Sequence, residues 1–404
     1  MDDPEQHRPA STPGRRIGTA VLVVVSALVV VAALVVAAVL LPGVLRGDDE
    51  DAPSAGSGAY ETACVAIPEL RTIDDLQTIV DTVRGGPELQ GGDVGADLEL
   101  QDGRRIWVVG DTLRSDDFDG QRFVRNSMLL ISPGCARTVL PEDNGALIPD
   151  RADGVGYWPM SVGRVQRGDT DVVGVGVQRV RSTGGPNTSE FENLGPAIAV
   201  FHVKRGGTPQ LVEVKDLGPD DASRTRPTWG AAVAVHDDWV YLYGTANPET
   251  DGVFGYSMRV ARVRIDDIRD QTAWRYWDGS RWRRDADTAQ ALISAQGGVS
   301  QTLSVFEQDG SWYAVSKQDE FLGHNLVIWK APSPTGPFTV ASTAATIPSD
   351  AATGQLRYMP LAHPGILPER GSVVVSYSRN NTDVGKVARN PFLYRPAFLR
   401  VPLP

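Results

Sequence analysis

The sequence is poor in the side chains that usually build metal sites and nucleic-acid-binding surfaces. It has two cysteines and five histidines, too few for a zinc-finger array, an iron–sulfur cluster or a disulfide-dense small scaffold. Lys and Arg number 39 against 50 Asp and Glu, and the formal net charge of −11 argues against nucleic acid as a partner. Charged residues make up 22% of the chain, close to the usual quarter, so a largely globular protein is expected.

One long uncharged segment lies near the N-terminus. Residues 17–45 carry no charge and are mostly Val, Ala and Leu, and about 20 such residues are enough to span a bilayer. The apolar core of a cleavable signal peptide has only about 7–15 residues, so this run predicts an uncleaved transmembrane helix. Cleavage near Ala37 or Ala38 is the alternative.

The charges that flank this run predict its orientation. Arg15 and Arg16 precede it, and the acidic stretch 48–51 follows it. The positive-inside rule then gives a cytoplasmic tail over residues 1–16 and places the C-terminal domain outside the cell membrane. Residues 46–59 are acidic and rich in small side chains, as in a flexible linker, which leaves residues 60–404 as the extracytoplasmic domain.

The two cysteines predict a disulfide. Cys64 and Cys135 would lie in an oxidising compartment, where such bonds persist. A bridge closing a loop of about 70 residues adds roughly 4 kcal/mol of stability in the chain-entropy model.

A repeat runs through residues 93–404. Five segments share an apolar strand, a tight turn with Asp, Gly or Arg, and a second apolar strand: 96–112, 160–177, 231–245, 302–318 and 361–378. Each is followed by a third apolar strand, and most by a short fourth. Four strands in each unit of about 65 residues are typical of a β-propeller. We therefore predict an all-β, five-bladed β-propeller preceded by a single N-terminal transmembrane helix.

The ends of this domain suggest how the ring closes. The fifth repeat ends near Leu403 without a fourth strand, and residues 60–70 precede the first repeat. We expect the N-terminal strand to complete blade 5, which removes open sheet edges. The disulfide would then hold that closure. Outside the apolar run, only residues 70–83 have the pattern of a short amphipathic helix.

Polar and aromatic side chains gather where the first strands begin and the second strands end. These ends meet on one face of a propeller, here called the front face. Side chains of this kind suit sugars, because Trp and Tyr stack on ring C–H groups while Asp, Asn and Arg bond hydroxyls. The predicted substrate-binding residues at this face are Trp158, Trp229, Asn247, Asp319, His363 and Arg379.

Glycoside hydrolysis needs two carboxyl groups that flank the scissile bond. Asp97 begins the first strand of blade 1 and Asp111 ends the second, and neighbouring strands lie about 4.8 Å apart. Glu320 would reach the cavity from blade 4. These three are the candidate catalytic residues. No cofactor or catalytic metal is expected, and a structural cation on the propeller axis is left open.

Several segments resemble a secreted actinobacterial five-bladed propeller family that includes mycobacterial endo-D-arabinanases. GADLEL followed by DGRRIWVVGDT is similar to that family's TDLG…FGDT opening, and WVYLYGT, MRVARVRIDDI and WRYWDGSRW are similar to its third blade. The chain departs from the family by having Ala before the aspartate of GADLEL and Glu after its leucine. The resemblance implies catalytic roles for Asp97 and Asp111, and a substrate contact for Asn126.

Two functions from different classes follow. The first is a membrane-anchored glycoside hydrolase that cleaves arabinofuranosidic linkages, with D-arabinan of the cell envelope (arabinogalactan or lipoarabinomannan) as the expected substrate. The second is a non-catalytic propeller that binds wall glycans as a sensor or scaffold. The partners are cell-envelope polysaccharide and the membrane, through residues 17–45.

Overall fold

The computed structural model describes residues 58–83, 86–184 and 191–404, which are built mostly from antiparallel β-sheet. The predicted tail 1–16, the apolar run 17–45 and residues 46–57 of the linker lie outside the described residues. Within the described ranges, no helix is long and apolar enough to cross a membrane.

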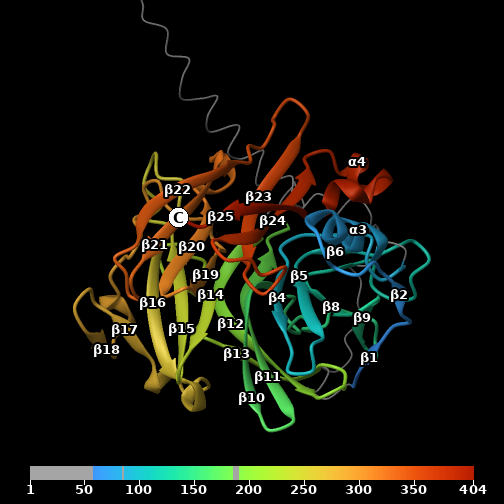
Figure 1. Cartoon of the computed structure of the whole chain (residues 1–404), viewed down its shortest axis with the longest axis horizontal. Coiled ribbons are helices and arrows are strands. Elements are labelled where there is room, and N and C mark those ends of the chain that lie inside the picture. Colours follow the sequence, from blue (N-terminus) through green and yellow to red (C-terminus); the bar gives the residue numbers. More distant parts are fainter. Residues whose placement is uncertain (1–57, 84–85, 185–190) are drawn as a thin grey trace, which may run out of the picture.

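Five sheets follow one another along the chain and are arranged around a common centre as the blades of a propeller (Figure 1). Blade 1 contains β4 (Ala96–Glu99), β5 (Arg105–Val109), β8 (Ser127–Ser132) and β9 (Cys135–Pro141). Blade 2 contains β10 (Gly156–Arg167), β11 (Thr170–Ser182), β12 (Phe191–Lys204) and β13 (Gln210–Asp216). Blade 3 contains β14 (Thr228–His236), β15 (Trp239–Ala246), β16 (Ser257–Arg264), β17 (Arg275–Trp277) and β18 (Trp282–Arg283).

The remaining blades follow the same order. Blade 4 contains β19 (Ser304–Gln308), β20 (Ser311–Lys317), β21 (Asn325–Ala331) and β22 (Thr339–Thr346), and blade 5 contains β23 (Gln355–His363), β24 (Ser372–Asn381) and β25 (Ala397–Pro402). The first strands contact one another all the way round: β4 with β10, β10 with β14, β14 with β19, β19 with β23, and β23 with β4. The five predicted hairpins and their third strands are therefore confirmed.

Shorter elements complete the domain. The two N-terminal strands are β1 (Ala59–Glu61) and β2 (Val65–Ala66). A small three-stranded sheet is formed by β3 (Gly91–Gly92), β6 (Thr112–Leu113) and β7 (Phe123–Val124). The α-helices are α3 (Ile73–Val83) and α4 (Val384–Arg389). The short 3₁₀ helices are η1 (Ile265–Asp267), η2 (Gln271–Ala273), η3 (Ala286–Thr288), η4 (Glu320–Leu322) and η5 (Pro391–Tyr394). The helix predicted over 70–83 is confirmed as α3, whereas α4 was not predicted.

Local sequence explains both the turns and the core. Asp309 and Gly310 join β19 to β20 with φ of 54° and 77°, the positive values that a tight two-residue hairpin turn requires. Apolar side chains of neighbouring blades pack into shared clusters, as where Val108 of blade 1 meets Val175 of blade 2. Because each blade buries both faces against its neighbours, the rigid part of the molecule is the ring of blades that surrounds the axis.

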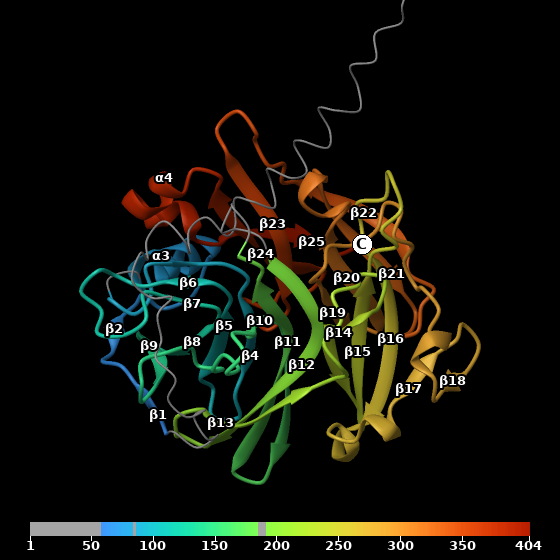
Figure 2. The ribbon, with the colours of Figure 1, turned by 180° about the vertical axis from the view of Figure 1, so that it is seen from behind.

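The N-terminal strand does not close the ring, contrary to the prediction. β1 and β2 both pair with β9, so they extend the outer edge of blade 1, and blade 5 keeps three strands. Helix α3 contacts β25 instead and lies at the junction of blades 5 and 1 (Figures 1 and 2). Its buried Leu76 and Ile79 pack in one cluster with Trp107 of blade 1 and Val374 of blade 5. A helix with one apolar face can cover two sheets at once, which a further strand cannot.

The predicted disulfide between Cys64 and Cys135 is present. Cys135 is the first residue of β9 and pairs with Ala66 of β2. The bond therefore fixes the N-terminal segment to the outer strand of blade 1, and the prediction that it holds the closure between blades 5 and 1 is wrong.

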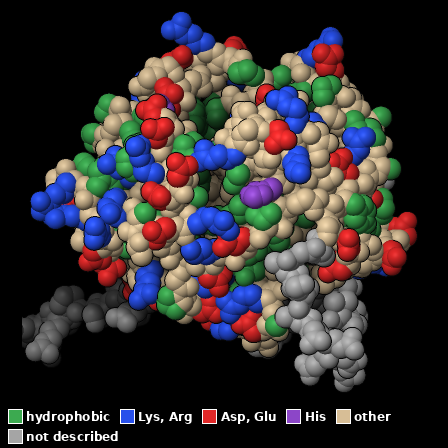
Figure 3. Space-filling view, turned by 90° about the horizontal axis from the view of Figure 1, so that it is seen from below, with side chains coloured by type: hydrophobic (Ala, Val, Ile, Leu, Met, Phe, Trp, Pro, Cys, Tyr) green, Lys and Arg blue, Asp and Glu red, His purple; other side chains and the backbone are tan. Residues whose placement is uncertain are grey.

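Charged side chains of both signs are interspersed over the face shown in Figure 3. Ion pairs join neighbouring blades, such as Arg167 of blade 2 with Asp266, which lies between β16 and β17 of blade 3. The face in this view therefore presents mixed charge to solvent and not a surface of one sign.

Candidate active site

A cavity of about 370 Å³ lies at the front face, where the first strands begin. We call it the carboxylate cavity. Every blade contributes to its wall, mostly through residues at or near the start of a first strand or the end of a second strand. These include Asp93 and Asp111 from blade 1, Trp158 and Gln178 from blade 2, Tyr256 from blade 3, Gln301, Thr302 and Glu320 from blade 4, and Tyr358 from blade 5.

Asp93 and Asp111 are brought together by the hairpin of β4 and β5. The backbone N–H of Gly110 donates to the Asp93 carbonyl oxygen at 2.8 Å, and the backbone of Asp111 hydrogen-bonds the Asp93 carboxyl group. A Cβ atom on Gly110 would lie 2.6 Å from Asp93 Oδ1. Glycine is thus needed at position 110 for the Asp93 side chain to lie against this strand.

Both aspartates have raised pKa values. Asp111 is only 5% exposed, and burial together with the charge of Asp93 raises its pKa well above the ordinary value, although Trp158 Nε1 donates to Asp111 Oδ1 at 2.7 Å. Burial raises the pKa of Asp93 to about 6, against hydrogen bonds from Tyr358 (2.8 Å) and Tyr394 that lower it. Burial and the repulsion between the two charges therefore favour retention of a proton by the pair.

Glu320 lines the same cavity from blade 4. It is 9% exposed, its Oε2 accepts from the backbone N–H of Gln301 at 2.8 Å, and burial raises its pKa. Asp319 and Glu320 have φ of 57° and 56°. Two successive non-glycine residues in the left-handed region carry strain, which is found preferentially at functional sites.

Aromatic side chains form part of the cavity wall. Trp158 holds Asp111 through its indole N–H, and its ring meets Phe191 edge to face, with centroids 4.6 Å apart. Phe321 stacks on Tyr358 at 4.9 Å. The cavity thus combines four carboxyl groups, those of Asp93, Asp111, Glu192 and Glu320, with aromatic faces, a surface suited to sugar rings.

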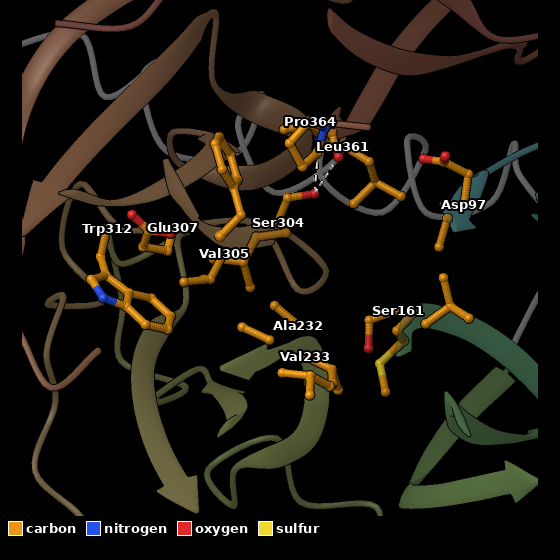
Figure 4. Close-up of a pocket in the computed structure, with 18 of the residues that line it drawn as sticks. Asp97, Ser161, Ala232, Val233, Ser304, Val305, Glu307, Trp312, Leu361 and Pro364 are labelled. Carbon is orange, nitrogen blue, oxygen red and sulfur yellow. Dashed lines mark hydrogen bonds between the residues drawn. The ribbon is translucent and has the colours of Figure 1, made fainter. Parts of the chain in front are cut away.

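Asp97 does not share this cavity with Asp111, so the prediction that they form a pair is wrong. Asp97 lies opposite Trp107 in the ladder of β4 and β5, and it lines a different cavity, of about 280 Å³, farther along the first strands (Figure 4). Its carboxylate pairs with Arg105 and with His363 Nδ1, the latter at 2.5 Å. Burial raises the pKa of Asp97, but His363 and Arg105 outweigh it and the net shift is downward. A carboxylate held ionised in this way is unsuited to proton transfer.

His363 joins blade 5 to blade 1 and does not line the carboxylate cavity. It is 1% exposed, its Nε2 hydrogen-bonds Ser376 Oγ at 2.7 Å, and its ring stacks on Trp107. These buried contacts of His363 join blade 5 to blade 1, where no shared strand joins the two blades in the described part of the chain.

Five other predicted substrate contacts also lie outside the carboxylate cavity. Asn126 Nδ2 donates to the carbonyl oxygens of Ile148 and Tyr157, and its Oδ1 accepts from the Ile148 N–H. Asn126 therefore holds the backbone next to Trp158. Asn247 caps the turn that follows it, and Arg379 donates to the carbonyls of Arg395 and Pro396.

Asp319 precedes η4 without lining the cavity. Trp158 is at the predicted place, and Trp229 lines a neighbouring cavity.

The important residue missing from the predicted catalytic set is Asp93. The ladder of β4 and β5 ends at the pair Ala96 and Val108, and Val94 and Gly95 beyond it have positive φ of 58° and 133°. Regular strand register therefore stops short of Asp93, and the sequence pattern alone did not select it as the neighbour of Asp111. Across the part of the chain that the structure describes, no three His, Cys, Asp or Glu side chains are grouped as a metal site.

Comparison with solved structures gives one similar fold and several weaker matches. A protein from Bacteroides ovatus ATCC 8483, described as a candidate hydrolase, has a TM-score of 0.59 at 19% identity, over 78% of this chain and 86% of that one. The GH43_1 enzyme from Xanthomonas citri complexed with xylotriose gives 0.44 at 15% identity, over 77% and 87%. The GH62 α-L-arabinofuranosidase catalytic domain from Coprinopsis cinerea gives 0.46 at 8% identity, over 85% and 96%.

No curated relative matches the sequence. One family profile does match, over residues 83–402, which span all five blades. The chain belongs to the family described as Domain of unknown function (DUF5005).

Proposed function

We propose that the protein is a glycoside hydrolase that works through Asp93 and Asp111. The observation that carries this proposal is that Asp93 and Asp111, two carboxyl groups with raised pKa values, line one cavity together with Trp158 and with Glu320 from blade 4. Glycosidic cleavage needs one protonated and one ionised carboxyl group at the same time. Carboxyl groups whose pKa values are raised by burial can supply the protonated member near neutral pH.

In this mechanism Asp111 is the general acid. It donates its proton to the leaving glycosidic oxygen as the bond from that oxygen to the anomeric carbon breaks. Asp93, ionised above about pH 6, accepts a proton from the water whose oxygen bonds to the anomeric carbon, or attacks that carbon itself. Glu320 faces the sugar from blade 4 and stabilises positive charge that develops on the ring.

We infer further that the substrate is an arabinofuranosidic glycan, with D-arabinan of the cell envelope as the best candidate. The support is the similarity of the blade 1 and blade 3 segments to propellers that cut D-arabinan. The apolar run 17–45 and its flanking charges favour a single-pass anchor in the cell membrane with the propeller outside. An anchored enzyme facing the wall would meet such a polymer directly.

The test is hydrolysis of purified mycobacterial-type arabinogalactan by the full-length protein, followed as released reducing ends. Asp93→Asn and Asp111→Asn should each lower the rate by about 10²–10⁴-fold, the usual contribution of a general acid or base. Asp309→Asn, which changes an exposed turn carboxylate, is the matched control and should not lower it. Saturable binding that survives both active-site changes, with no release, would favour the glycan-binding scaffold instead.

A further inference from the structure

A second cavity adjoins the carboxylate cavity between blades 2 and 3. We call it the side cavity; it has a volume of about 390 Å³. The two cavities share Gln178, Asn193, Arg224, Tyr256 and Gln301 as wall residues. Asp93, Asp111 and Glu320 line only the first, and Trp229 lines only the second. Because the same side chains border both spaces, a long ligand at the carboxyl groups can continue past them toward Trp229.

Three buried polar atoms at this border have no hydrogen-bond partner among the described residues. They are Gln178 Nε2, Asn193 Oδ1 and Thr302 Oγ1. Gln178 is 3% exposed and Thr302 is 2% exposed. All three residues line the carboxylate cavity, and Gln178 and Asn193 also line the side cavity. Leaving such atoms unpaired costs stability, so their presence here requires an explanation such as a ligand or ordered water.

The Gln178 amide is held in place by its other atom. Its Oε1 accepts from Gln301 Nε2 at 2.6 Å. Gln301 is fixed in turn, because its backbone N–H donates to Glu320 and its carbonyl accepts from Thr245 Oγ1 at 2.6 Å. The free Nε2 group is thus a fixed donor, and Asn193 Oδ1 is an acceptor nearby along the same wall. A donor, an acceptor and a hydroxyl are the groups that bind sugar hydroxyls.

The charges around both cavities favour a neutral ligand. Arg226 is paired with Asp221 and Arg224 with Glu249, each at 3.0 Å. The side cavity has three carboxylate residues against two arginines, and the carboxylate cavity has four against one. This net negative lining repels uronates and phosphorylated sugars.

We propose that the two cavities form one groove for a neutral glycan chain, in which Gln178, Asn193 and Thr302 bind hydroxyls of sugars beyond the residue held at the carboxyl groups. This inference rests on the proposed glycan substrate. It concerns the binding of sugars along the glycan, which is measured without hydrolysis.

The experiment is calorimetric titration of the full-length Asp111→Asn protein with arabinofuranosyl oligosaccharides from disaccharide to hexasaccharide. Affinity should rise with length beyond the disaccharide. Adding Thr302→Val or Gln178→Met should weaken binding of the longer chains by about two- to tenfold, the loss of one neutral hydrogen bond. Thr302→Ser keeps the hydroxyl and should restore affinity. Oligogalacturonates of equal length should bind more weakly than the neutral chains.

The control is Ser342→Ala in β22, because Ser342 Oγ is another buried hydroxyl without a partner in the described structure but lies outside both cavities. It should leave affinity unchanged. The groove is wrong if affinity stops rising at the disaccharide, or if Thr302→Val and Gln178→Met leave the affinity for long chains unchanged. The proposed function would still stand in that case, provided that the unmodified protein hydrolyses the glycan. Absence of both binding and hydrolysis at every length would instead overturn the proposed function and this inference with it.

Discussion

The backbone N–H of Gly110 donates to the Asp93 carbonyl oxygen at 2.8 Å and so holds Asp93 beside Asp111. Asp93 lies between β3 and β4, and Asp111 lies between β5 and β6. Both connections are short, and backbone hydrogen bonds tie one to the other. A site tied to strands in this way keeps its geometry better than a site on a long loop.

The first prediction concerns the pH dependence of hydrolysis. Asp93 must be ionised to act as a base, and its pKa is about 6, so kcat/KM should fall about tenfold for each pH unit well below 6. At higher pH the rate should fall again as Asp111 loses its proton. Initial rates on arabinogalactan between pH 4 and pH 9 test this. A rate that is constant from pH 4 to pH 7 would contradict the role of Asp93.

The second prediction concerns stability and follows from the same shift. Folding raises the pKa of Asp93 from 3.8 to about 6, so the folded state binds more protons than the unfolded state between these values. Its contribution to stability is fully present below about pH 3.8 and is lost as the pH rises through about 6. The Asp93→Asn variant has no carboxyl group to ionise at this position. Its free energy of unfolding, relative to that of the unmodified protein, should therefore be about 2 kcal/mol higher at pH 7.5 than at pH 4.

Chemical denaturation at the two pH values measures this difference. Because Asp93→Asn also removes the charge that raises the pKa of Asp111, the measured gain includes the response of Asp111. Asp309→Asn is again the control, since its exposed carboxylate should show no such gain. An equal difference between the proteins at both pH values would show that Asp93 does not titrate as inferred.

The sequence predicted the blades better than the site. The hairpin at Asp309–Gly310 and the strand 325–331 are encoded by local turn chemistry and apolar runs, so both could be located in advance. Asp97 lies in β4 opposite Trp107, whereas Asp93 precedes β4 and the left-handed residues Val94 and Gly95. The backbone turn at these two residues brings Asp93 to Asp111, and local pattern does not reveal it. Ring closure depends on where Leu76 and the rest of α3 pack, which is a tertiary choice that local pattern does not determine.

The third prediction concerns Asp97, which the structure places in the closure of the ring. Asp97→Asn would leave Arg105 and His363 facing an amide in a buried network, and should cost about 3–5 kcal/mol of unfolding free energy. Hydrolysis measured well below the unfolding temperature should change less than about tenfold, because Asp97 does not touch the carboxylate cavity, whereas catalytic carboxyl groups contribute more. Normal stability with abolished hydrolysis would return Asp97 to the catalytic set.

The fourth prediction concerns the disulfide. Cys64 and Cys135 are 71 residues apart, and removing the bond by Cys64→Ser with Cys135→Ser should lower stability by about 4 kcal/mol. Since both residues lie at the outer edge of blade 1, the rate of hydrolysis at low temperature should be retained. Denaturation with and without a reducing agent tests this, and the double variant should no longer respond to the reductant.

The last prediction concerns Gly110. A methyl group at this position would lie 2.6 Å from Asp93 Oδ1, closer than real contacts allow, so Gly110→Ala must displace the Asp93 side chain from Asp111. Displacement of a catalytic group by about 1 Å can cost about 10²-fold in rate, and the pH profile should lose its limb near pH 6. Gly174→Ala is the matched control, because the nearest atom to its new Cβ would be Ile198 Cγ2 at 3.9 Å. Both variants should fold, as judged by their unfolding temperatures, and only Gly110→Ala should lose activity. If Gly110→Ala keeps its full rate, the position of the Asp93 carboxyl group is not what hydrolysis depends on.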